Sequence, residues 1–168
     1  ARYIGASAMY AFQFQKALHV AEKHGWTRFV SMQNHYNLIY REEEREMMPL
    51  CVEEKIAVTP YSPLASGRLA RAASETTTRY EADPIAKTKY GATAESDQVI
   101  IDRVAEMAGK YGIPMAHVSL AWMLHKPGIT APIIGVRTLA QLEESLGATD
   151  LHLAAEEFTR LDEASAHT

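Results

Sequence analysis

Three side chains whose chemistry suits small-molecule binding fall at equivalent places along the chain. Ser7, Gln33 and Tyr61 each come at the end of a short apolar segment that is typical of a buried strand. A hydroxyl and an amide together donate and accept hydrogen bonds, and a phenol ring can stack on a flat ligand. Plainer explanations exist: a helix cap for Ser7, a surface amide for Gln33 and a core side chain for Tyr61. Their place on three successive strand ends favours one shared site, because ligands of (β/α)8 barrels bind at those ends.

Two further segments are suited to binding an anion. Residues 62–69 contain hydroxyls, a glycine and Arg68, which could hold a pyrophosphate through backbone N–H groups and one cation. A plain turn after a strand explains the same residues. Residues 135–138 lead into a predicted helix that begins at Leu139, so the N–H groups of its first turn would face an anion there. Arg137 in that loop is equally explained as a solvated arginine.

Other kinds of chemistry find little support. His19 and His24 are five residues apart on a predicted helix and do not share a face, and no pair of residues has the spacing of a metal site. No Gly-x-Gly-x-x-Gly segment is present. His35 could line the mouth of a site, although a structural role is the stronger explanation. Cys51 lies in a helical pattern without a basic neighbour, which favours a buried structural thiol over a nucleophile.

The elements that must position these residues alternate between strand and helix. Predicted strands cover residues 2–7, 26–33, 56–61 and 130–135, and predicted helices cover residues 9–24, 41–55, 97–111, 115–125, 139–147 and 154–164. Pro49 predicts that the second helix starts late or kinks. Residues 62–96 are predicted to be irregular. Alternating elements imply parallel strands joined by right-handed crossovers, either in half of an eight-fold barrel or in a small doubly wound sheet.

Composition limits the possible functions and partners. The chain has 168 residues, a net charge of −4 and scattered basic residues, which argues against a nucleic-acid partner. No apolar run approaches the roughly 20 residues that cross a bilayer, so no membrane partner is expected. The single cysteine suits a reducing cytoplasm.

A complete (β/α)8 barrel needs roughly 250 residues. Because the sequence opens at Ala1 directly with a strand pattern, we expect a fragment.

Six segments carry a pattern that extends over essentially the whole chain. They are residues 2–7 (RYIGAS), 32–37 (MQNHYN), 59–69 (TPYSPLASGRL), 120–124 (LAWML), 132–138 (PIIGVRT) and 142–148 (LEESLGA). In this order and spacing the chain resembles the aldo-keto reductase family, most closely its bacterial and potassium-channel-β-subunit-like members. The resemblance implies an α/β fold: the C-terminal half of a (β/α)8 TIM barrel, with four parallel strands, helices outside and no internal domain boundary over residues 1–168.

The resemblance also implies a function. It is that of an NADP(H)-dependent oxidoreductase that reduces aldehydes or ketones, with this chain supplying the cofactor-binding half. One alternative is a nucleotide-binding barrel that regulates or binds a partner protein without catalysis. Another is a different (β/α)8 enzyme that uses the last two loops for phosphate. The implied partners are a small carbonyl substrate and either the missing N-terminal half of the barrel or a second half-barrel.

Particular residues take roles in this resemblance. Ser7 and Gln33 would hydrogen-bond the nicotinamide carboxamide, and the Tyr61 ring would stack on the nicotinamide. The phosphates and the adenosine would be bound by the remaining residues of the site, which are Ser62, Leu64, Ser66, Arg68, Gly135, Arg137, Gln141 and Glu144. Arg137 would contact the 2′-phosphate, which favours NADP(H) over NAD(H).

The sequence departs from the family pattern in three ways. Ala8 stands where many members have Asn or Ser, and Ser145 stands where most have Asn, so each position lacks one polar contact. The third departure is that the catalytic Asp, Tyr, Lys and His of the family match no position here and are expected upstream of Ala1. The segment alone is therefore expected to be inactive.

Overall fold

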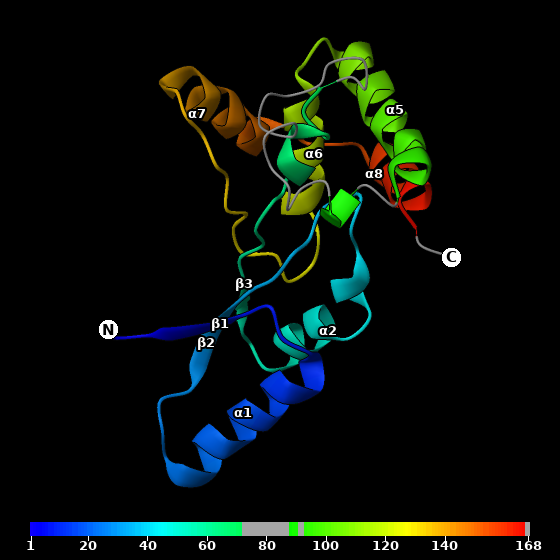
Figure 1. The fold of residues 1–168 in the computed structure, drawn as a ribbon. Helices are drawn as coiled ribbons and strands as arrows, with labels where there is room; N and C mark the ends of the chain where they lie inside the picture. Colours follow the sequence, from blue (N-terminus) through cyan, green and yellow to red (C-terminus); the bar gives the residue numbers. More distant parts are fainter. Residues whose placement is uncertain (72–87, 91–92, 167–168) are drawn as a thin grey trace.

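The computed structural model describes residues 1–71, 88–90 and 93–166, and within them three parallel strands form one sheet. The strands β1 (Ile4–Ser7), β2 (Phe29–Gln33) and β3 (Ala57–Val58) lie side by side in that order (Figure 1). Ser7 pairs with Gln33, and Met32 pairs with Val58. The predicted parallel arrangement is confirmed for these three strands.

The predicted fourth strand, over residues 130–135, is not formed, so the prediction of four strands was wrong for the described residues. The segment runs parallel to β3 but is joined to it by two isolated bridges, Val58 to Ile129 and Tyr61 to Ile133. The physical reason lies in Pro60. Thr59 and Tyr61 direct their N–H groups to β2, so the nitrogen of Pro60 faces residues 130–135 and has no N–H group to donate to the ladder that would link the two bridges.

Helices connect and cover the strands. They are α1 (Ala11–His24), α2 (Met47–Glu53), α5 (Ala94–Tyr111), α6 (Met115–Leu124), α7 (Leu139–Leu146) and α8 (Ala155–Ala164), with short 3-10 turns η1 (Glu42–Glu44), η2 (Ala65–Gly67) and η3 (Gly147–Asp150). As predicted, α1 ends at His24. It is followed by Gly25, whose φ of 63° is the left-handed conformation that glycine adopts without strain. The second helix starts late, at Met47, which leaves Pro49 in the first turn, where no N–H group is needed.

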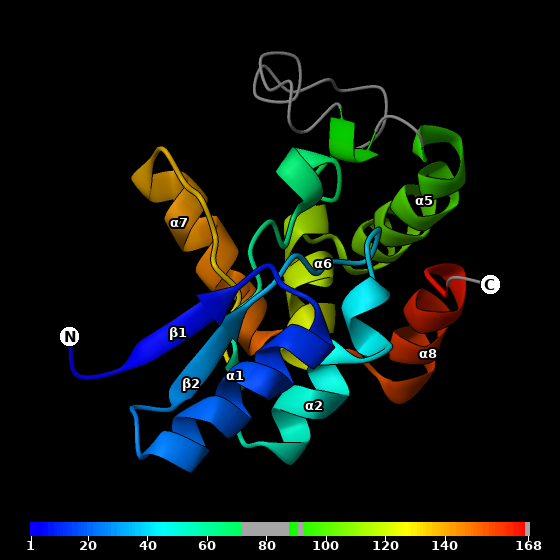
Figure 2. The same ribbon diagram turned by 60° about the horizontal axis from the view of Figure 1, so that its bottom comes forward.

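Two apolar clusters form the core, and the first of them holds α1 and α2 to the sheet. In the first, Phe14 of α1 and Leu50 of α2 pack with Met32 and Val58 of the strands, and Figure 2 shows α1 and α2 side by side next to these strands. The second cluster surrounds Trp122 of α6 and joins α5, α6 and α8. Cys51 lies buried in the first cluster, as predicted. Burial, followed by the negative charge of Glu43, raises the pKa of its thiol to about 11, so it is not ionised at neutral pH.

Part of the predicted irregular segment, residues 72–87 and 91–92, lies outside the described residues. The helix predicted to follow it at Asp97 begins three residues earlier, at Ala94. Across the ranges that the structure describes, no helix combines the length and the apolar character that a membrane span requires.

Several apolar side chains of the sheet are open to solvent. Ile4, Val30 and Ile133 are 37%, 42% and 43% exposed, whereas Val58 is fully buried beneath the helices. In the described part of the chain, β1 has a neighbouring strand on one side only. Open strand edges and half-exposed apolar residues are features that another part of a protein usually covers.

We therefore expect residues 1–168, expressed alone, to associate or to melt without cooperativity, and to show no reductase turnover. Each exposed apolar side chain forgoes part of the roughly 1.5–3 kcal/mol that full burial contributes, against a total stability of about 5–15 kcal/mol for a typical domain. Sedimentation velocity and thermal melting test this expectation. A monodisperse monomer with a sharp, cooperative melt would contradict it.

Candidate functional site

The carboxyl ends of the strands bring the three residues singled out first to one edge of the sheet. Ser7 and Gln33 are direct cross-strand partners, and both are exposed. Tyr61 lies one step further along the edge, paired with His35 on one side and with Ile133 on the other. Ser7 does not cap the following helix, because the N-cap of α1 is Tyr10. The parallel register thus places a hydroxyl, an amide and a phenol ring in a row.

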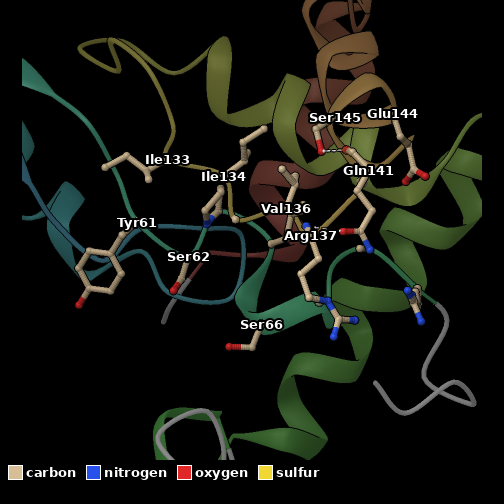
Figure 3. A pocket seen from close by; sticks show the side chains of 17 residues that line it. Tyr61, Ser62, Ser66, Ile133, Ile134, Val136, Arg137, Gln141, Glu144 and Ser145 are labelled. Atoms are coloured by element: carbon tan, nitrogen blue, oxygen red, sulfur yellow. Dashed lines mark hydrogen bonds between the residues drawn. The ribbon is translucent and has the colours of Figure 1, made fainter. Parts of the chain in front are cut away.

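Beside Tyr61 lies a cavity of about 620 Å³, between the segment that follows β3 and the segment that leads into α7. It brings together most of the residues predicted for the site: Tyr61, Ser62, Leu64, Ser66, Gly135, Arg137, Gln141 and Glu144. Figure 3 shows Tyr61 and Glu144 towards opposite ends of the view, with Arg137 and Ser66 between them. The cavity is therefore elongated along the line that joins the end of β3 to α7.

One wall of the cavity is a tightly turned strap, residues 62–71. Ser62, Ala65 and Ser66 have positive φ values of 55°, 47° and 58°, a conformation that is uncommon for residues other than glycine. A hydrogen bond from the core stabilises the turn: the Nδ2 group of the fully buried Asn37 donates to the Ser62 carbonyl at 2.9 Å. Such strained backbone persists only where surrounding contacts fix it, and it is concentrated at binding sites.

The opposite wall is the start of α7. Thr138 is the N-cap, and its hydroxyl accepts a hydrogen bond from the Gln141 backbone N–H at 3.2 Å, as the predicted helix start at Leu139 requires. The Gln141 side chain turns back and accepts from the Arg137 N–H at 2.8 Å. Ser145 also lines the cavity, and its hydroxyl donates to the Gln141 carbonyl. These contacts fix the backbone from which the Arg137 guanidinium extends (Figure 3).

Three of the predicted residues lie outside the cavity lining. Ser7 and Gln33 are further along the strand edge, beyond Tyr61. Arg68 is turned away: it forms an ion pair with Asp97, both side chains are largely buried, and its guanidinium lies 5.7 Å from the centre of the Tyr90 ring. A cation neutralised in this way anchors the strap to α5.

Arg71 also lines the cavity, and it lies just beyond the predicted anion-binding segment of residues 62–69. The signal in the sequence that would have extended this segment is a second arginine three residues after Arg68. Among the described residues that line the cavity, Arg71 and Arg137 are thus the two arginines, and Glu144 is the one carboxylate. The cavity suits a ligand that carries more than one anionic group.

His35 lies behind Tyr61 rather than in the cavity. Its ring stacks on Tyr61 and Tyr40, with centroids 5.2 Å and 4.4 Å away, and its Nε2 is 2.7 Å from the Tyr90 hydroxyl. Burial, together with the positive charge of Lys89, lowers the pKa of His35 to about 4. The imidazole is therefore neutral at physiological pH and acts as a flat packing surface for Tyr61.

A second histidine supports the far end of the cavity. His117 of α6 donates from Nε2 to the backbone carbonyl of Glu144, near the carboxyl end of α7. Its ring lies so close to Gly147 that a Cβ atom there would come within 2.6 Å of it. Because α7 has no buried side chain of its own, this contact is a main support for the helix that presents Gln141 and Glu144.

Comparison with known proteins identifies the family. Residues 1–166 match the model of the aldo/keto reductase family, and the chain belongs to that family. It is 49% identical over 166 residues to the aldo-keto reductase dtxS3 of Metarhizium robertsii, covering 96% of this chain and 44% of that protein. It is also 46% identical over 165 residues to the versiconal hemiacetal acetate reductase of Aspergillus parasiticus, covering 97% and 48%.

A third relative is a putative aryl-alcohol dehydrogenase of Schizosaccharomyces pombe, 44% identical over 165 residues, with 96% of this chain and 46% of that protein covered. The chain spans about half the length of the curated relatives it matches. These three relatives are fungal proteins. A particular likeness to bacterial and channel-β-subunit-like members stays a prediction.

The close contact of His117 with Gly147 predicts that substitutions at these two positions do not have additive effects on the free energy of unfolding. In the full-length protein, Gly147→Ala should lower the free energy of unfolding by about 1–3 kcal/mol, because the new methyl group overpacks against the imidazole. In a His117→Ala background the same substitution should be neutral or stabilise by about 0.5–1 kcal/mol, since Gly147 has helical φ and alanine is favoured there. Urea denaturation of the four proteins measures the coupling. Equal losses in both backgrounds would refute it.

Proposed function

We propose that the protein is an NADP(H)-dependent oxidoreductase that reduces aldehydes or ketones to alcohols, and that this chain supplies the cofactor-binding half. The observation that carries the proposal is the cavity, which gathers eight of the residues that the family resemblance assigns to the cofactor on two facing segments. The names of two relatives, a hemiacetal acetate reductase and an aryl-alcohol dehydrogenase, support the same class of chemistry.

The residues present fit a phosphorylated dinucleotide. A volume of about 620 Å³ lies within the range of small-molecule sites. Arg71 and Arg137 provide two guanidinium groups, each able to bind a phosphate through two parallel hydrogen bonds. We assign the 2′-phosphate to Arg137 because its backbone is bonded to Gln141, on the wall that would contact the adenosine. Gln141 and Glu144, on the same wall, would then contact the adenosine. The backbone of Ser62, Leu64, Ser66 and Gly135 would follow the pyrophosphate, with Arg68 in a supporting role.

The nicotinamide end would lie at the strand edge. Tyr61 would stack its ring on the nicotinamide and so fix which face is open to the substrate. Ser7 and Gln33 would hydrogen-bond the carboxamide. Among the described residues neither side chain has a hydrogen-bond partner of its own, so both are available for such a contact.

When bound, NADPH supplies a hydride for the carbonyl carbon, and the carbonyl oxygen takes up a proton to give the alcohol. We infer that the proton donor lies in the remaining length of the protein, with the family's Asp, Tyr, Lys and His. That part, or a second half-barrel, would also cover the open sheet edges. Because Cys51 is buried and is the one cysteine of the 168 residues, we place the protein in a reducing compartment such as the cytoplasm.

The assignment of Arg137 predicts cofactor discrimination. In the full-length protein, Arg137→Ala should weaken NADPH binding by about 1.5–3 kcal/mol and leave NADH binding nearly unchanged, because only NADPH loses a charge-assisted hydrogen bond. Fluorescence titration with both cofactors measures this. Arg45→Ala removes an exposed arginine far from the cavity lining and serves as the control. Equal losses for NADPH and NADH would show that Arg137 does not contact the 2′-phosphate.

The stacking role of Tyr61 predicts a difference between two substitutions. Tyr61→Ala should weaken NADPH binding more than Tyr61→Phe, because phenylalanine keeps a ring for the nicotinamide and also keeps the packing against His35. The two dissociation constants are compared with that of the unchanged protein. Similar losses in both variants would point to a role of the hydroxyl instead.

A further inference from the structure

A lysine lies against Tyr61 outside the cavity. The Nζ atom of Lys89 is 4.6 Å from the centre of the Tyr61 ring and 3.4 Å from its hydroxyl. Tyr61 lines the cavity and Lys89 does not, so the ammonium group lies just beyond the nicotinamide end of the proposed site. Within the described residues, the exposed side chain of Lys89 has these two weak contacts, so it can turn towards an anion at little cost.

The position of Lys89 is fixed by its neighbour. Tyr90 is only 2% exposed and is part of the core cluster around Trp122. Its hydroxyl accepts a hydrogen bond from Asn37 at 3.2 Å and pairs with the neutral His35 at 2.7 Å. The Arg68 guanidinium lies over the ring of Tyr90. Because Tyr90 is buried and bonded on several sides, the backbone that carries Lys89 stays at the edge of the sheet.

The charge of Lys89 is not neutralised by the described residues around it. Within those residues no carboxylate lies at ion-pair distance from its Nζ atom, and the nearby Asp97 is paired with Arg68. Burial, followed by the negative charges of Glu43 and Glu42, raises the pKa of the Tyr40 hydroxyl, and neither glutamate lies at ion-pair distance from Lys89. His35 contributes no positive charge at neutral pH. Among the residues that the structure describes, the strand edge beside Tyr61 therefore carries one exposed cation, Lys89.

We propose that Lys89 binds an anionic group of the substrate, so that the protein prefers aldehydes or ketones that also carry a carboxylate. The inference rests on the proposed function, because hydride transfer at the ring stacked on Tyr61 requires the carbonyl group to lie close to that ring. A cofactor phosphate is the less suitable partner for Lys89. The two arginines of the lining serve the phosphates from within the cavity, while Lys89 lies outside the lining, next to the uncharged ring.

The test compares two aldehydes of the same shape in the full-length protein with NADPH. 4-Formylbenzoate carries the carboxylate, and its methyl ester does not. We expect the ratio of their kcat/KM values to fall about tenfold in Lys89→Gln and further in Lys89→Glu, with most of the change in KM. Lys16→Gln removes an exposed lysine from α1 and should leave the ratio unchanged. A ratio that stays constant in the Lys89 variants would overturn the inference.

A binding measurement separates this inference from the proposed function. If the unchanged protein reduces neither aldehyde, the proposed function fails, and calorimetric titration with 4-(hydroxymethyl)benzoate and its methyl ester still tests Lys89. Weaker binding of the carboxylate alone by Lys89→Gln supports the inference. Equal binding by both proteins, or a loss of NADPH affinity in place of carboxylate affinity, overturns it.

Discussion

The backbone of β3 and its extension to Tyr61 is the element on which the rest of the structure depends. On one side, Thr59 and Tyr61 donate to the carbonyl groups of Met32 and Asn34, each at 2.9 Å. On the other side, the carbonyl groups of Val58 and Pro60 accept from Thr130 at 2.9 Å and Ile133 at 2.8 Å. The strap and the segment leading to α7 both continue from this paired backbone. The two walls of the cavity are therefore held at a fixed separation by four hydrogen bonds of one short strand.

The helices α6 and α8 are held together by a partly buried network of charged side chains around Trp122. The Asp162 carboxylate of α8 accepts from the Trp122 indole N–H at 2.9 Å and pairs with Lys126 at 2.7 Å, and Arg41 donates to the Asp162 carbonyl at 2.9 Å. Removing one partner of such a network leaves an uncompensated charge, so its members hold α6 and α8 in one arrangement. Since α6 carries His117, the network also stabilises the support beneath α7.

The distribution of neutralised and free cations defines what the site can bind. Three arginines have the same side-chain chemistry, yet they differ in what surrounds them. Arg68 forms an ion pair with Asp97, whereas Arg71 and Arg137 line the cavity. A similar contrast separates His35 from Lys89: burial keeps the imidazole of His35 neutral, whereas the side chain of Lys89 is exposed at the strand edge. Desolvation and long-range pairing, rather than residue type, determine which side chains present a charge to a ligand.

The sequence by itself determined the features that depend on near neighbours. The apolar segments before Ser7, Gln33 and Tyr61 predicted a shared strand edge. The predicted helix ends at residues 24 and 111 and the predicted helix start at Leu139 agree with the structure. Each depends on hydrogen bonds or backbone conformations within a few residues. Only the tertiary structure decided the rest. Pro60 left residues 130–135 without a donor for a continuous fourth strand, and Asp97 turned Arg68 away. The fold also placed Arg71 in the cavity and Lys89 against Tyr61. These outcomes join residues that are far apart in the chain, so no local pattern records them.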